Sequence, residues 1–284
     1  MSEMILTLDK VCKSYRDFAL RDVSFTLPRG YIMGFVGENG AGKTTTIRCI
    51  LGGTRTESGS ISVFGKDSRT EPVAVRSRIG AVYDTLMFAG HLRLSEVEAH
   101  LRRFYPKWDS KQFRTFADRF RLPEKTKCGK YSRGMQMKLM LSAALSHHAE
   151  LLILDEPTAG LDPVARDELL EILSEYIAGG EGSVLFSTHI TADVERIADY
   201  VTVLHKGKVW FTGAKDDLME EYAVVQRGEP FPQPLRDACI GLHDTPSGCA
   251  AILPTDRLTE LPKDAIFEPA KIEDLLVYLA KGGE

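Results

Sequence analysis

Short apolar runs that end at glycine or at charged residues recur along the chain, and several contain no polar position. Runs of this kind, rich in β-branched or aromatic side chains, predict β-strands. The predicted strands are residues Met4 to Leu8, Ala19 to Thr26, Tyr31 to Val36, Ser60 to Phe64, Ile79 to Tyr83, Leu151 to Leu154, Ser183 to Ser187 and Tyr200 to His205. Strands that are apolar throughout are typical of a parallel sheet with both faces covered by helices. The pattern therefore predicts an α/β fold.

Helical periodicity follows two of these strands. One helix is expected to begin at Thr44, and another to span Asp162 to Ile177, where Asp162 can cap the helix and Pro163 suits its first position. The expected apolar face of the second helix consists of Leu169, Ile172, Leu173 and Tyr176. Residues 93–145 are helix-like and basic-aromatic, with interruptions at Pro106 and Pro123. We therefore expect a helical subdomain at about residues 86–145.

The composition changes after about Met219, where proline and glycine interrupt the chain before a last amphipathic helix. The apolar positions of that helix are Ile272, Leu275, Leu276 and Leu279. A chain of 284 residues can hold one large domain with a small appendage. We expect a main domain at residues 1–218 and a small accessory region at residues 219–284.

Composition narrows the class of protein. The hydrophobic fraction is 43% and the charged fraction 27%, so a packed core is expected. The formal net charge of -4 gives no general attraction to nucleic acid, and no nucleic-acid partner is expected. Five cysteines without a C-x-x-C pair disfavour both a disulfide framework and a zinc site. The start MSEMILTLDK and the lack of a long apolar run predict a chain that is neither secreted nor transmembrane.

Residues Gly37 to Thr44 carry the clearest chemical signal. They fit G-x-x-x-x-G-K-[ST] directly after a predicted strand and before a predicted helix. In such a loop the backbone N–H groups surround phosphate oxygens, Lys43 reaches the β- and γ-phosphates, and Thr44 offers its hydroxyl to Mg²⁺. The expected nucleotide-binding residues here are Gly37, Glu38, Asn39, Gly40, Ala41, Gly42, Lys43, Thr44 and Thr45. An ordinary glycine-rich turn is the weaker reading.

A second signal is the buried strand that begins at Leu151 and ends in two carboxylates. Asp155 stands where ligands bind at the edge of an α/β sheet, and it is expected to hold the metal. Glu156 points elsewhere and can act as the general base for the attacking water. Alone, this pattern fits a plain turn at a strand end equally well; beside the loop it predicts ATP hydrolysis.

With these two motifs, residues 4 to 215 resemble the ATP-binding subunit of an ATP-binding cassette (ABC) transporter. Tyr131 to Gln136 looks like the signature motif of that family. The resemblance implies that Ser132 and the backbone of Gly134 contact the γ-phosphate held by the opposite subunit. A segment such as this, taken by itself, is more often just a capped helix start.

The same resemblance assigns three further residues. Asp162 in Ala159-Gly160-Leu161-Asp162 matches a loop that contacts the other subunit, although a helix cap alone explains it. His189 matches the switch histidine that hydrogen-bonds the γ-phosphate. Tyr15 matches the aromatic residue that stacks on adenine, with an edge-strand tyrosine as the alternative.

Two positions depart from the family pattern. Asp84 stands where the family has glutamine; a carboxylate can still accept a hydrogen bond from metal-bound water, so Asp84 joins Thr44 and Asp155 as a candidate metal residue. Arg133 and Met135 give the signature a form that resembles subunits exporting drugs, antibiotics or peptides. This form favours export over import.

The resemblance implies a P-loop NTPase with a mostly parallel, RecA-like sheet, an antiparallel β subdomain, a helical subdomain and a small accessory region. It implies an ATPase that uses ATP and Mg²⁺ and dimerises with a second ATP-binding subunit around two nucleotides. Its partners would be integral-membrane transporter subunits, at the cytoplasmic face of the cell membrane. The alternative is a non-transport ABC ATPase of the DNA-repair or ribosome-associated type, but the chain has neither a long coiled-coil insertion nor a second cassette.

Several other residues are expected to have ordinary structural roles. Trp108, His147 and His148 are assigned to packing or to a helix surface, and Cys49 to a small core position. Two basic pairs, Arg102-Arg103 and Arg119 with Arg121, are interpreted as solvated helix faces.

Overall fold

A six-stranded sheet forms the centre of the protein in the computed structural model, which describes residues 3–180, 182–245 and 248–281. Its strands, in spatial order, are β10 (Lys208–Ala214), β9 (Tyr200–His205), β3 (Ile32–Val36), β8 (Ser183–Thr188), β7 (Leu151–Asp155) and β6 (Ile79–Val82). Every neighbouring pair is parallel except β10 with β9. The carboxyl ends of β3, β8 and β7 therefore lie side by side at one edge, where ligands bind in sheets of this kind.

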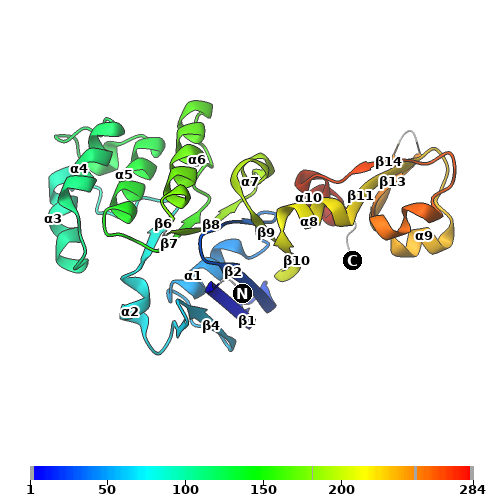
Figure 1. Ribbon diagram of the computed structural model, residues 1–284, viewed down its shortest axis with the longest axis horizontal. Helices are drawn as coiled ribbons and strands as arrows, with labels where there is room; N and C mark the ends of the chain where they lie inside the picture. Colours follow the sequence, from blue (N-terminus) through cyan, green and yellow to red (C-terminus); the bar gives the residue numbers. More distant parts are fainter. Residues whose placement is uncertain (1–2, 181, 246–247, 282–284) are drawn as a thin grey trace.

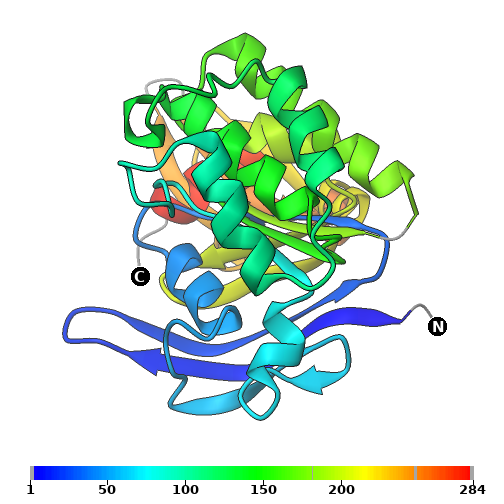
Figure 2. The same ribbon diagram turned by 90° about the vertical axis from the view of Figure 1, so that its left-hand side faces the viewer.

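A second, antiparallel sheet lies below the first. It contains β2 (Ala19–Pro28), β1 (Met4–Ser14), β4 (Ser58–Val63) and β5 (Lys66–Asp67) in that order. Helix α1 (Lys43–Ile50) lies between the two sheets, and Figure 2 shows the layers edge-on. The predicted strands are confirmed to within a few residues, except that β1 continues to Ser14 because it pairs with both β2 and β4.

The helices of the first sheet cover its other face. The long ones are α3 (Leu94–Phe104), α4 (Ser110–Arg119), α5 (Arg133–Leu145) and α6 (Pro163–Ala178), with the shorter η1 (Cys128–Lys130) and α7 (Thr191–Ile197) between and after them. The short α2 (Pro72–Arg76) lies on the other side, where Val75 packs in the core that contains α1 and the antiparallel sheet. Figure 1 shows α3, α4 and α5 grouped at one end of the molecule. The predicted helix at Asp162 is confirmed, because the Asp162 carboxylate accepts hydrogen bonds from the Val164 and Ala165 N–H groups and Pro163 opens α6.

Alternate side chains of the central strands fill two separate cores. In β7, Leu151 and Ile153 pack with the antiparallel sheet and α1, whereas Leu152 and Leu154 pack under the helices of the other face. All four side chains are fully buried. A strand buried on both faces needs no polar position, which explains the continuous apolar runs.

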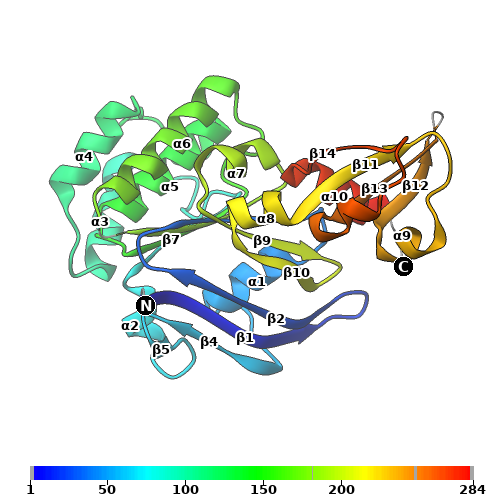
Figure 3. The same cartoon turned by 45° about the vertical axis from the view of Figure 1, so that its right-hand side comes forward.

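The accessory region folds as a sheet of its own. It follows α8 (Lys215–Glu221) and pairs β12 (Ile240–Thr245), β13 (Gly248–Pro254), β11 (Tyr222–Arg227) and β14 (Ile266–Pro269) in that order, with α9 (Gln233–Ala238) and η2 (Thr255–Glu260) between strands. The sequence did not predict these four strands. The predicted last helix is confirmed as α10 (Ile272–Lys281), which packs Ile272 and Leu275 into the main core beside Val194 of α7. Figure 3 shows α10 between this sheet and the rest of the molecule.

The residues expected to have structural roles differ in their burial and contacts. Trp108 is partly buried against the core, and Cys49 is buried. Arg102 and Arg103 are exposed on α3, as expected. Arg119 differs, because its guanidinium donates two hydrogen bonds, of 2.8 and 3.0 Å, to the Glu175 carboxylate and so links α4 to α6. Among the described helices, none is long and apolar enough to cross a bilayer.

Gly34 of β3 provides a test of the packing between the sheet and α7. A Cβ atom at this position would lie 2.5 and 2.8 Å from the two Cγ atoms of Val194, which is fully buried and has a stiff, β-branched side chain. We expect Gly34→Ala to lower the free energy of unfolding by about 1–3 kcal/mol, measured by urea denaturation. Gly53→Ala is the control, because its nearest neighbour would be a backbone oxygen at 3.6 Å. Equal stability of both variants would contradict this packing.

His147 makes the stability of the fold depend on pH. Its ring is buried and stacks on Tyr105 at a centroid distance of 4.0 Å, whereas His148 is exposed. Burial lowers the pKa of His147 to about 4 from an ordinary value of 6.5. As pH falls below about 6.5, the unfolded chain takes up a proton that the folded state binds only near pH 4. Neutral His147 therefore contributes to the free energy of unfolding at neutral pH. This contribution, at most about 3 kcal/mol, is lost as the pH falls from about 6.5 to about 4.

The pH dependence is checked by comparing His147→Phe with His148→Asn in urea unfolding at pH 7 and pH 4.5. A phenylalanine side chain in place of His147 would keep the stacked ring without a titrating group, so the loss on the acid side should shrink. His148→Asn changes an exposed imidazole whose charge lowers the pKa of His147 less than burial does, so this variant should alter the difference between the two pH values much less than His147→Phe. An undiminished loss in His147→Phe would assign the acid sensitivity to other groups.

Candidate nucleotide site

The loop from Gly37 to Gly42 connects β3 to α1 and curls around the Lys43 side chain. The Lys43 ammonium donates hydrogen bonds to the carbonyl oxygens of Gly37, at 2.7 Å, and Glu38, at 3.2 Å. Gly42 has φ = 113°, and a Cβ there would lie 2.6 Å from both Phe18 and Leu20. Glycine alone adopts this positive φ without strain and has no Cβ to clash with Phe18 and Leu20, so the curled loop depends on Gly42.

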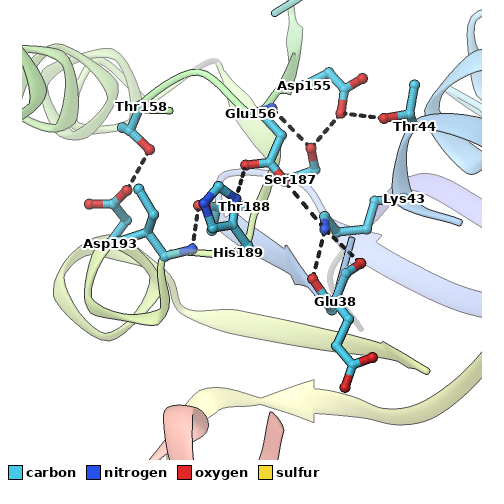
Figure 4. A network of polar contacts seen from close by, with 12 residues as sticks. Glu38, Lys43, Thr44, Asp155, Glu156, Thr158, Ser187, Thr188, His189 and Asp193 are labelled. Carbon is cyan, nitrogen blue, oxygen red and sulfur yellow. Dashed lines mark hydrogen bonds and ion pairs between the residues drawn. The ribbon is translucent and has the colours of Figure 1, made fainter. Parts of the chain in front are cut away.

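Asp155 stands at the end of β7, opposite the loop. One of its oxygens, Oδ1, accepts hydrogen bonds from the Thr44 hydroxyl at 3.2 Å and from the Ser187 hydroxyl at 2.6 Å (Figure 4). Asp155 is almost fully buried and Ser187 is completely buried. These contacts hold the first turn of α1 against the ends of β7 and β8.

The donor set around Asp155 fits a magnesium ion. Mg²⁺ prefers hard oxygen ligands and is usually held by one or two side chains together with phosphate oxygens and water. Here a hydroxyl from Thr44 and a carboxylate from Asp155 meet beside the phosphate loop. Among the described residues no cluster of three histidine, cysteine, aspartate or glutamate side chains offers a different kind of metal site.

Glu156 turns away from Asp155 because its backbone has a positive φ of 50°. This conformation is unfavourable for a residue with a side chain. Its N–H donates to the Ser187 hydroxyl at 3.0 Å and to the Ser187 carbonyl at 3.2 Å, which holds the turn. The carboxylate then lies 3.3 Å from the Lys43 ammonium and 2.8 Å from Nδ1 of His189 (Figure 4). The candidate base, the candidate phosphate-binding lysine and the candidate switch histidine thus form one cluster.

A second polar network supports the start of α7 and was not foreseen. The fully buried Asp193 carboxylate accepts hydrogen bonds from the Thr158 hydroxyl at 2.6 Å and from Arg166 Nε at 2.5 Å. It therefore ties the loop after Glu156 to α6 and to the segment that carries His189. An aspartate in the first turn of a helix is a sequence signal, but too common a one to single out Asp193.

The hollow beside the loop has a volume of about 490 Å³ and is lined by Asp17 and Phe18 as well as by loop residues and Glu156. Tyr15, the expected adenine-stacking residue, does not line it. The Tyr15 ring is half exposed, with the Lys13 ammonium 5.4 Å from its centre. Phe18 was missed by sequence reasoning, although an aromatic residue three positions after Tyr15 was a visible signal.

Ser132 and Gly134 lie outside the cluster around Lys43. Ser132 is exposed and caps α5, its hydroxyl accepting a hydrogen bond from the Met135 N–H at 3.3 Å. A Cβ on Gly134 would lie 3.6 Å from Leu161, and one on Gly160 would lie 3.4 Å from Arg133. The signature motif therefore packs beside the loop that carries Asp162.

Asp84 follows β6 and is exposed. Within the part of the chain that the structure describes, no hydrogen bond or ion pair joins it to Thr44 or Asp155. Its assignment to the metal stays a prediction.

The accessory region also reaches the edge of this site. A hollow of about 540 Å³ is bordered by Gly37 to Asn39, by His189 to Ala192, and by Leu276, Val277 and Ala280 of α10. The last helix thus lies beside both the phosphate loop and the segment that carries the candidate switch.

Comparison with known proteins agrees with this arrangement. The family model described as ABC transporter matches residues 20–159. The chain is 36% identical over 217 residues to the ABC-type transporter ATP-binding protein EcsA of Bacillus subtilis, an alignment that covers 74% of this chain and 86% of that protein. A solved structure of an ATP-binding subunit of an ABC transporter superposes with a TM-score of 0.69 at 32% identity, covering 75% of this chain and 91% of the other. The chain therefore belongs to the ATP-binding subunits of ABC transporters, which hydrolyse ATP.

Two further relatives extend the comparison. The bacitracin transport ATP-binding protein BcrA of Bacillus licheniformis is 33% identical over 214 residues, covering 74% of this chain and 69% of that protein. A Nod factor export ATP-binding protein I of Burkholderia lata is 33% identical over 283 residues and covers 90% of both chains. The non-transport alternative, a DNA-repair or ribosome-associated ATPase, finds no support in these comparisons.

Proposed function

We propose that this subunit drives an exporter by binding and hydrolysing Mg-ATP at a site shared with a second ATP-binding subunit. The observation that carries the proposal is that Lys43 and His189 both contact the carboxylate of Glu156. Members of the family work with membrane permease subunits, and the main domain, residues 1–218, would be the part that does so here. In this proposal the subunit works at the cytoplasmic face of the membrane.

Each residue of the site has a distinct task in this proposal. Lys43 and the loop from Gly37 to Thr45 bind the phosphates, and Glu156 accepts the proton of the attacking water. His189 hydrogen-bonds the γ-phosphate and, through the Glu156 carboxylate, holds the base in place. Thr44 and Asp155 would hold Mg²⁺, with Asp84 contributing through water; the ion supplies positive charge that offsets the phosphate oxygens. Tyr15 would stack on adenine beside Phe18.

Ser132 and Gly134 serve the other subunit in this proposal. They occupy the start of a helix of 13 residues, whose N–H groups and dipole favour an anion. Two subunits in head-to-tail orientation would each present this helix start to the phosphates bound by the other. Asp162 lies next to the signature and would contribute to the same interface.

Export is the favoured direction of transport. The signature reads Tyr-Ser-Arg-Gly-Met at residues 131–135, and two relatives carry transport or export of bacitracin and Nod factor in their names. The accessory region, residues 219–284, would cover the apolar flank of α7 and influence the switch segment through α10.

The test is purification of the tagged chain from membranes solubilised in detergent. We expect an integral-membrane protein to copurify and phosphate release to depend on both Mg²⁺ and ATP. A purified chain that hydrolyses ATP but never brings a membrane protein with it would contradict the transporter role and leave the ATPase assignment intact.

A further inference from the structure

A separate hollow, which we call the arginine pocket, lies at the end of α1 farthest from Lys43. It has a volume of about 360 Å³ and lies among the end of α1, β4 and α2, whose positions Figure 1 shows. Arg55, Arg69 and Arg76 stand at its rim, and all three are exposed. No aspartate or glutamate is among the described residues that line it. The rim therefore carries three positive charges, although the chain as a whole has a formal net charge of -4.

Most of this charge has no partner within the protein. In the described residues, Arg55 makes no ion pair or side-chain hydrogen bond. Arg76 uses only Nε, which donates to the Pro72 carbonyl at 3.1 Å, and its Nη1 atom extends toward Gly52. Arg69 is 3.6 Å from the Asp67 carboxylate. The pocket therefore keeps at least two guanidinium groups available for an anion.

The floor of the pocket adds hydrogen-bonding groups. Ser68 and Thr56 are 7% and 9% exposed, and neither hydroxyl has a hydrogen-bond partner among the residues that the structure describes. Neither hydroxyl oxygen is among the buried polar atoms that lack a partner, so both can be reached from the pocket and can form hydrogen bonds with a ligand oxygen. The rest of the floor is apolar and is formed by Cys49 and Ile61.

The combination of guanidinium forks and hydroxyl groups fits a phosphate group better than other anions. Guanidinium pairs bind phosphate oxygens through two parallel hydrogen bonds, and a phosphate monoester carries a charge of about −1.5 to −2 at neutral pH. The C-terminal end of α1 opposes an anion with roughly half a negative charge, which two or more full positive charges exceed. We propose that the arginine pocket binds a phosphate monoester group, carried by a small molecule or by a lipid headgroup.

This site is distinct from the nucleotide site but is joined to it by a short helix. α1 begins at Lys43 and ends at Ile50, and Cys49 in its last turn is part of the pocket floor. A ligand in the pocket would therefore contact the helix that positions Lys43 and Thr44. The proposal does not depend on transport or on shared hydrolysis, and its test is run with Mg-ADP saturating the phosphate loop.

The test is calorimetric titration of glycerol 3-phosphate into the full chain with Mg-ADP present. We expect saturable binding that weakens at least about tenfold in Arg55→Gln/Arg76→Gln, because two charge-assisted contacts are lost. Thr56→Val, which keeps the shape of the side chain, should weaken binding about threefold or more. The matched control is Arg102→Gln/Arg103→Gln, which removes the same charge from an exposed part of α3 and should leave binding unchanged.

A second arm distinguishes the source of the phosphate. Sedimentation with phosphatidylcholine vesicles containing phosphatidic acid, a monoester, is compared with vesicles containing phosphatidylglycerol, a diester. Arginine-dependent binding of glycerol 3-phosphate indicates a soluble ligand, and arginine-dependent binding to phosphatidic acid alone indicates a lipid headgroup. The proposal is overturned if neither probe binds, if the α3 control loses as much binding as the pocket variant, or if glycerol 3-phosphate does not bind and the two lipids bind equally.

Discussion

Glu156→Gln should reduce ATP turnover by about 10² to 10⁴ while leaving ATP binding within a few-fold of normal. The glutamine keeps the shape of the side chain but cannot accept a proton from water. Lys43 would lose one contact, the ion pair at 3.3 Å, and would keep the carbonyl oxygens of Gly37 and Glu38. Binding and hydrolysis should therefore separate in this variant.

The measurements are steady-state phosphate release and equilibrium binding of a fluorescent ATP analogue. Glu171→Gln is a matched control, because it makes the same chemical change on the exposed side of α6 and should leave both quantities unchanged. Turnover close to the native rate in Glu156→Gln would show that another group accepts the proton.

Lys43→Ala should strongly weaken ATP binding and abolish turnover. The Lys43 side chain is 6% exposed, and its ammonium is fixed by two loop carbonyl oxygens and the Glu156 carboxylate. Removing it eliminates the charge that meets the phosphates and leaves Glu156 without its ion-pair partner. A charge-assisted hydrogen bond contributes about 1.5–3 kcal/mol, so ATP affinity should fall by roughly tenfold to a hundredfold or more.

Lys107→Ala is the control for this variant, because it removes an exposed lysine from the segment after α3. Thermal unfolding of both variants without nucleotide separates a loss of ATP affinity from a loss of folding. Unaltered ATP affinity in a folded Lys43→Ala protein would contradict the placement of the phosphates at this loop.

The local motifs were predictable because each depends on a few consecutive residues. The phosphate loop follows the apolar strand Ile32–Val36, and Asp155 with Glu156 ends the apolar strand Leu151–Asp155. A strand end places the following residues at the sheet edge whatever the rest of the chain does. For the same reason, the cap at Asp162 could be predicted without the tertiary structure.

Contacts that depend on sheet register could not be predicted in this way. Ser187 reaches Asp155 because these two residues are register partners in β8 and β7, 32 positions apart in sequence. Phe18 reaches the phosphate loop because its ring packs on Gly42. Neither contact can be recognised from the pattern of apolar and polar residues around it in the sequence.

The accessory sheet was missed for another reason. Proline and glycine suggested an irregular segment, but they lie mostly between strands, and the short apolar run at residues 249–253 is the buried centre of β13. β13 pairs with β11 so that Ala251 lies opposite Val225. These two residues are too far apart in sequence for a local hydrophobic pattern to predict their pairing.

The central claim is that each site is completed by Ser132 of a second chain, and light scattering of the Glu156→Gln protein tests it most directly. With Mg-ATP this variant should have twice the mass of one chain, and adding Ser132→Arg should return it to the mass of one chain while ATP still binds. Ser95→Arg, which changes an exposed serine in the first turn of α3, is the matched control and should leave the dimer intact. An ATP-dependent dimer that survives Ser132→Arg, or no dimer in Glu156→Gln at any ATP concentration, would contradict the shared site.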